Sequence, residues 1–143
     1  MRIGRLPLRL RHGGGDGGRI ELRALDQDSR FASTGVLLGS AATGYSGGRY
    51  SLDVGNAVAL DSIATALAAS GLSDAISIHS RAGNLELAAG NTLLARDIRL
   101  TADAATIASS AGNIVIAGTL DASSVAGGSI ALNGFSGVDV QGR

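Results

Sequence analysis

Gly112-Asn113-Ile114-Val115-Ile116 is the stretch that decides the fold. It joins a turn-forming glycine and asparagine to aliphatic residues at alternate positions, and such a strand sends one set of side chains inward and the other to solvent. Similar phrases, in which a glycine pair or a Gly-Asn step precedes an alternating strand, begin at Gly17, Gly47, Gly83 and Gly127. A unit of one turn and one strand cannot bury its own apolar side, so the copies must stack on one another, and Ile114, Ile116, Ile130 and Leu132 are predicted to be buried in the core.

The composition favours a thin, layered core. The chain has 143 residues, enough for one domain, and its apolar residues are mostly aliphatic, because aromatic residues make up only 3%. Stacked rows of aliphatic side chains fill a narrow core without large aromatic rings. An apolar content of 45% and a single proline argue against disorder despite 22 glycines. Without cysteine, disulfides, metal-thiolate sites and thiol catalysis are excluded.

Charge is balanced overall but is distributed unevenly. Residues 1–30 carry seven arginines and four acids, whereas residues 31–143 carry five arginines and eight acids. In the basic N-terminal segment, arginines alternate with leucines over residues 5–11, which predicts a strand with a charged outer face rather than a nucleic-acid arm. No signal peptide and no apolar run of about 18 residues is present, so a secreted form would take its signal from a longer parent.

The phrases are densest after Arg81, where strands recur every seven to thirteen residues. The predicted strands are 84–88, 93–95, 97–101, 105–108, 113–117, 119–121, 129–133 and 137–141. Such spacing is also typical of an antiparallel sandwich. Repetition of the same short sequences at the corners favours a parallel coil. The glycines Gly18, Gly48, Gly83 and Gly112 are separated by 30, 35 and 29 residues, which indicates coils of about 20 to 30 residues.

The middle of the chain departs from this pattern. Leu60, Ile63 and Leu67 fall at helical spacing, and Asn56 is placed to cap a helix predicted over about 57–70. Before it, a loop around one strand at 36–38 is expected. The expected organisation is a single segment, 1–143. It has a basic strand or arm at 1–16, β coils at 17–55, a helical insertion at 56–71 and β coils at 72–143.

The segment Ala111–Ala122, followed by Gly127–Leu132, resembles the filamentous haemagglutinin family of large bacterial exoproteins exported by two-partner secretion. The similarity is strongest over 81–143 and weaker over 17–55. It implies a right-handed parallel β-helix (solenoid) that forms an internal part of a long adhesive fibre, secreted or displayed at the cell surface in association with the outer membrane. Implied partners are a receptor or glycan on host or bacterial cells and, for the parent protein, an outer-membrane secretion partner. Self-association through exposed β-helix ends is also expected.

The alternative is a carbohydrate-active parallel β-helix enzyme, of polysaccharide lyase or hydrolase type. Such enzymes set carboxylates and a basic residue on one outer face, and Asp97, Arg99 and Asp103 are the best trio for that role. Charged residues are expected on the outer side of any exposed strand. We therefore predict no catalytic residue and a non-enzymatic segment.

Other candidate sites also have simpler structural interpretations. The run Gly13–Gly18 resembles one copy of a calcium-binding glycine-aspartate repeat, but such sites need consecutive copies, so a flexible turn is predicted. His12 and His79 are far apart and lack metal-ligand spacing, and His79, which follows the inward-facing Ile76 and Ile78, is predicted to be a surface histidine. The threonines form no ice-binding ladder. No metal, cofactor or nucleic-acid partner is expected. Asn84 and Asn113 are predicted to stack at equivalent corners as structural residues.

Overall fold

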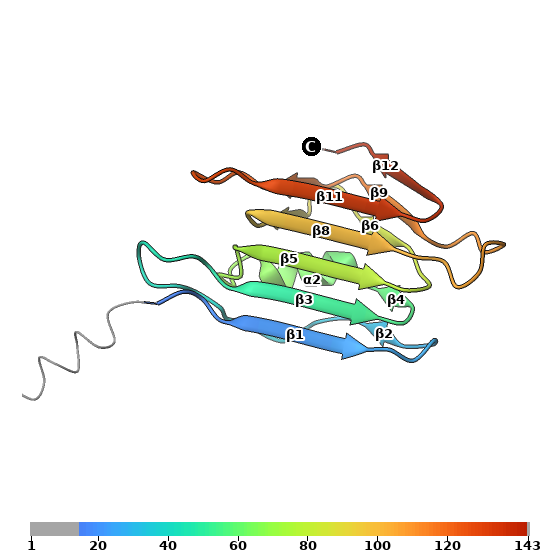
Figure 1. Cartoon of the computed structure of the whole chain (residues 1–143), viewed down its shortest axis with the longest axis horizontal. Coiled ribbons are helices and arrows are strands. Elements are labelled where there is room, and N and C mark those ends of the chain that lie inside the picture. The colour runs from blue at the N-terminus through green and yellow to red at the C-terminus, as the bar shows by residue number, and fades with distance from the viewer. Residues whose placement is uncertain (1–14, 143) are drawn as a thin grey trace, which may run out of the picture.

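The computed structural model describes residues 15–142 as a mainly β fold with one helix (Figure 1). Residues 1–14 lie outside the described residues. They include the predicted basic strand, His12, Gly13 and Gly14. The elements are β1 (Arg19–Ala24), β2 (Arg30–Phe31), β3 (Arg49–Val54), β4 (Ala57–Val58), α2 (Leu60–Leu67), β5 (Ala75–Ser80), β6 (Leu85–Leu87), β7 (Thr92–Leu94), β8 (Asp97–Ala102), β9 (Asn113–Ile116), β10 (Thr119–Asp121), β11 (Ser129–Gly134) and β12 (Gly137–Val140).

All strand pairing within residues 15–142 is parallel, which excludes the antiparallel sandwich there. The largest sheet has five strands in the order β1-β3-β5-β8-β11. A three-stranded sheet has the order β12-β9-β6, and the pairs β10-β7 and β2-β4 form two smaller sheets. Consecutive strands of the chain mostly belong to different sheets, so each sheet is built from segments far apart in sequence.

The five long strands align residue for residue. Their first residues, Arg19, Arg49, Ala75, Asp97 and Ser129, are register partners and are spaced by 30, 26, 22 and 32 residues. Inward positions of these strands form two aliphatic rows that contain one tyrosine. The rows are Ile20-Tyr50-Ile76-Ile98-Ile130 and Leu22-Leu52-Ile78-Leu100-Leu132. In the three-stranded sheet, Leu85 and Leu87 align with Ile114 and Ile116, and all four are buried.

The prediction that Ile114 and Ile116 are core residues is confirmed, but the same prediction for β11 is wrong. Ile130 is 46% exposed and Leu132 is only half-buried. The reason is position: β11 is the last strand of its sheet, so no layer covers it as β11 covers β8. Alternation correctly predicts which side of β11 faces inward, but not that this side lies at the end of the stack.

The helix is shorter than predicted. It spans Leu60–Leu67, because Ala57 and Val58 instead form β4, which pairs with β2. Asn56 does not cap it: the N-cap is Ala59, without a side-chain hydrogen bond, and the Asn56 carbonyl accepts a hydrogen bond from the Ser80 hydroxyl. The apolar side of α2 is buried as its spacing predicts, and it packs against β6 and β7.

Two predicted strands are loops. Residues 105–108 belong to the long connection between β8 and β9, where Ile107 is 91% exposed, and residues 36–38 belong to the connection between β2 and β3. These connections lie within the two longest spacings of the large sheet, 30 and 32 residues. Local β propensity is overridden here because neither segment has a strand to pair with.

The repeated phrases fall into two groups, and they do not all mark the same corner of the fold. Gly18, Gly48 and Gly128 precede strands of the five-stranded sheet, whereas the Gly-Asn steps precede β6 and β9. Gly112 needs its glycine for a φ of +86°, while a Cβ on Gly48 would lie 2.7 Å from the Gly18 carbonyl oxygen. The backbone N–H of Asn113 donates to Asn84 Oδ1 at 3.0 Å, which confirms that the two asparagines occupy neighbouring, equivalent corners. The Asn113 side chain itself donates to the Ser110 carbonyl at 2.7 Å, so the two side-chain amides are not bonded to each other.

Candidate functional site

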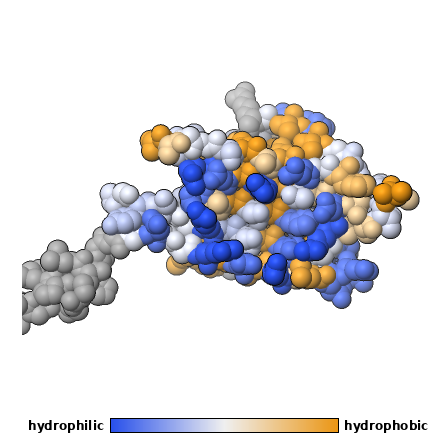
Figure 2. Space-filling model, in the orientation of Figure 1, coloured by the Kyte–Doolittle hydropathy of each residue, from blue (hydrophilic) through white to orange (hydrophobic). Residues whose placement is uncertain are grey.

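Charged side chains gather at both ends of the outward face of the five-stranded sheet. Figure 2 shows hydrophilic surface over each end of the strands, with paler and hydrophobic surface between them. We name the cluster at the start of the strands the arginine groove, after Arg19, Arg49 and Arg96 around Asp74. The cluster at their end, formed by Asp53, His79, Arg81 and Asp103, is the histidine clasp.

Asp74 organises the arginine groove. Its side chain is only 7% exposed, and its two oxygens accept separate hydrogen bonds from Arg49 Nε at 2.8 Å and Arg96 Nε at 3.0 Å. Burial raises the pKa of Asp74, but hydrogen bonds from Arg96 and Arg49 and their positive charges outweigh it, so the net shift is downward. The carboxylate therefore stays ionised at neutral pH and holds two guanidinium groups in place.

Stacked turns hold these residues together. Arg49 begins β3, while Asp74 and Arg96 immediately precede β5 and β8. The Asp74 amide donates to the Gly48 carbonyl at 3.0 Å, and the Arg96 amide donates to the Ser73 carbonyl at 2.9 Å. Each turn is thus bonded to the one beneath it, and the three charged side chains become neighbours although 22 to 25 residues separate each arginine from Asp74.

The groove beside these turns has a volume of about 830 Å³. Its lining includes three arginines against two carboxylates, Asp16 and Asp74, together with the exposed ring of Tyr45. Arg19 also pairs with Glu21 at 3.0 Å, and Arg96 Nη2 pairs with Asp97 at 3.0 Å. Arg49 uses only Nε toward Asp74, and its side chain is 63% exposed, so its other donors are accessible to solvent. Guanidinium groups beside an aromatic ring suit an oxyanion, such as a carboxylate or sulfate, carried on a sugar or peptide.

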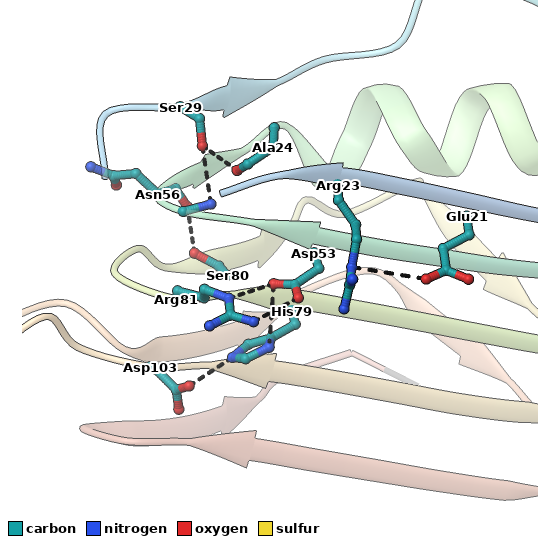
Figure 3. Close-up of polar contacts among 11 residues, drawn as sticks. Glu21, Arg23, Ala24, Ser29, Asp53, Asn56, His79, Ser80, Arg81 and Asp103 are labelled. Atoms are coloured by element: carbon teal, nitrogen blue, oxygen red, sulfur yellow. Dashed lines mark hydrogen bonds and ion pairs between the residues drawn. The ribbon is translucent and has the colours of Figure 1, made fainter. Parts of the chain in front are cut away.

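The histidine clasp is a chain of ion pairs that runs from Arg81 through Asp53 and His79 to Asp103 (Figure 3). Arg81 donates to both oxygens of Asp53 at 2.8 Å, and this bond lowers the pKa of Asp53 against the opposing effect of burial. His79 Nε2 lies 2.7 Å from Asp103 Oδ2, and its Nδ1 lies 3.6 Å from Asp53 Oδ1. Both ring nitrogens face carboxylates. His79 points outward as predicted, but it is half-buried and partnered rather than a simple surface histidine.

The trio considered for the alternative enzyme, Asp97, Arg99 and Asp103, does not assemble. Asp97 contacts Arg96 and the Ser129 hydroxyl at one end of β8, whereas Asp103 contacts His79 beyond the other end. Six residues of strand separate the two carboxylates by about 20 Å, and glycoside hydrolysis needs a pair about 5 to 10 Å apart. Within residues 15–142, no three His, Cys, Asp or Glu side chains are grouped to hold a metal.

Sequence reasoning missed Asp74, Arg49 and Arg96 because they form no local motif. The available signal is their place in the repeated phrase: each lies at the first strand residue or one before it. Asp53 and His79 likewise share one register position, the fifth of their strands. Aligning the strands by register, instead of scanning for spacing motifs, would have brought both clusters together.

Comparison of the chain with models of protein families, with curated proteins and with solved structures finds no match. No helix within the described residues is long and apolar enough to cross a membrane. The two charged clusters and the stacked strands that hold them are therefore the features that bear on function.

Proposed function

We propose that this chain is a structural and adhesive segment of a secreted or surface-displayed bacterial fibre of filamentous haemagglutinin type. In this proposal the parallel sheets are the sides of a right-handed β-helix. Five strands in unbroken register, recurring every 22 to 32 residues, support a coiled path, and connections between parallel strands of one sheet are right-handed in nearly all proteins. The parent protein would cross the outer membrane with a dedicated secretion partner.

The adhesive surface we propose is the arginine groove. The observation that carries this proposal is the buried Asp74, whose two oxygens fix Arg49 and Arg96 at the edge of an 830 Å³ groove. An arginine held in one orientation loses less side-chain entropy when it binds a carboxylate or sulfate. The receptor is then a glycan or protein with acidic groups on a cell surface. Binding by one segment is weak and gains strength by repetition along the fibre.

The test is adhesion of beads coated with the chain to cell monolayers and to immobilised acidic glycans. Replacing both Arg49 and Arg96 with Gln should reduce binding about tenfold or more, since each charge-assisted hydrogen bond contributes about 1.5–3 kcal/mol. The matched control replaces Arg23 and Arg99 with Gln, which removes the same charge from the same sheet outside the groove. An equal loss of binding in both double variants would show that binding depends on overall charge and not on the groove, and would contradict the proposal.

A second candidate function is that of a carbohydrate-active enzyme, because the histidine clasp places acid and base groups on an outer sheet face. We expect no activity, since both nitrogens of His79 and both oxygens of Asp53 already have protein partners. The chain should therefore release no reducing ends or unsaturated products from acidic polysaccharides, with or without divalent metal. Cleavage abolished by Asp97→Ala or by Asp103→Ala would establish the enzyme instead.

A further inference from the structure

Within residues 15–142, the five-stranded sheet has two unpaired edges. Among the described residues β1 pairs only with β3 and β11 only with β8, and the two lie at opposite ends of the sheet (Figure 1). Each therefore presents one row of backbone N–H and C=O groups without a strand partner. Parallel strands accept further parallel strands at such edges, so both ends are able to extend the sheet.

The β11 end also exposes apolar side chains. Ile130, Val138 and Val140 are 46%, 45% and 53% exposed, while their register partners one layer below, Ile98, Ile114 and Ile116, are at most 1% exposed. Figure 2 shows hydrophobic surface at the upper edge of the molecule, where β11 ends the sheet. One more layer of strands would cover the apolar surface that these three side chains expose.

The β1 end matches the β11 end residue for residue. Inward residues would pair Ile20 with Ile130 and Leu22 with Leu132, as at every joint inside the sheet. The third inward position would pair Ala24 with Gly134, two small residues. Outward, Arg19, Glu21 and Arg23 would face Ser129, Ala131 and Asn133, so no like charges would meet. The internal joint between β1 and β3 is less favourable in this respect, because it aligns Arg19 with Arg49.

We propose that the β11 edge is a docking surface for the β1 edge of a second copy of this chain, in parallel and in the register Arg19 to Ser129. The contact is head-to-tail, so it does not close and builds an open stack. Antiparallel pairing of two β1 edges about Glu21 would instead place Glu21 against Glu21 and Arg19 against Arg23. The inference goes beyond the proposed adhesion, because it needs no receptor and gives the isolated chain its own route to a fibre.

Single cysteines test the register, since the chain contains none. Glu21→Cys and Ala131→Cys lie on the outer sides of β1 and β11, and in the proposed register their Cα atoms are about 4.8 Å apart, within disulfide range. Mixing these variants under mild oxidation should give a mixed dimer. Glu21→Cys with Ser129→Cys, about 8 Å apart, should cross-link far less. Glu86→Cys, exposed on another sheet, gives the background from collisions.

The mass of the uncross-linked chain in solution provides the second measurement. It should rise with concentration, and Ile130→Arg should return it to the monomer, whereas Ser51→Arg on the outer face of β3 should not. Strong Ala131→Cys homodimers without the mixed dimer would show head-to-head docking and overturn the proposed register. A chain that stays monomeric, with no cross-linking above the Glu86→Cys background, would overturn the docking surface altogether. Neither result affects the bead assay of the arginine groove.

Discussion

Ile116→Asp tests whether the stacked rows are the source of stability, because the same row contains its own control. Ile116 is fully buried in β9, and its register partner Val140, in the edge strand β12, is 53% exposed. Replacing Ile116 removes about 1.5–3 kcal/mol of apolar burial and places an unpaired carboxylate in an aliphatic row, at several kcal/mol more. The sum, at least about 5 kcal/mol, approaches the whole stability of many domains.

Val140→Asp makes the same chemical change with little of this cost. Half of the valine is already exposed, so its burial is worth about 1 kcal/mol and the new carboxylate remains hydrated. Urea unfolding followed by circular dichroism measures both variants. With a slope of about 2 kcal/mol per molar urea, Ile116→Asp should lower the midpoint by about 2.5 M or unfold the chain, and Val140→Asp by about 0.5 M. Equal shifts in the two variants would refute the layered core.

Three further outcomes are expected. Ala64→Pro should remove α2, at about 3 kcal/mol, while the parallel-sheet signal persists, and Thr65→Ala on the exposed side should change little, as measured by circular dichroism and backbone chemical shifts. Burial raises the pKa of Tyr50 to about 12, and its hydroxyl has no partner among the described residues. Tyr50→Phe should therefore raise the free energy of unfolding by about 1 kcal/mol, and the urea midpoint by about 0.5 M. The pKa of Asp74 is lowered in the folded state, so its contribution is fully present above the unfolded value of about 3.9 and is lost as pH falls through the folded value. Asp74→Asn should therefore destabilise the chain at pH 7 and flatten its loss of stability below about pH 4, and an unchanged acid profile would contradict this assignment.

Alternation predicts the sides of the strands well, because it depends only on backbone geometry. Leu85, Ile98 and Ile114 are buried as their place in the phrase requires. The alternating pattern does not show how many further strands lie above a given strand in its sheet. The same pattern therefore gives a buried Ile98 and an exposed Ile130.

The candidate site was less predictable for a related reason. Asp74 has no unusual sequence neighbours, and it becomes the centre of the arginine groove only when parallel strands that start 26 and 22 residues apart bring Arg49 and Arg96 around it. The trio considered for the alternative enzyme does not form because Asp97 and Asp103 lie six residues apart along an extended strand, which separates them in space. Side-chain contacts in this fold run across paired strands, so register partners on neighbouring strands meet, whereas residues six apart on one strand do not.

The unequal spacing of the aligned strands has a consequence for how this scaffold tolerates change. Between 22 and 32 residues separate strands that nevertheless keep one register, so connection length and strand alignment vary independently. Foreign peptide inserted in the exposed connection at 122–127 alters the outline of the molecule without moving a strand. Loss of a single residue within β8 does the opposite, since it turns every following side chain of that strand to the wrong face. Diversity can therefore accumulate at the corners of the molecule while its sheets remain the same.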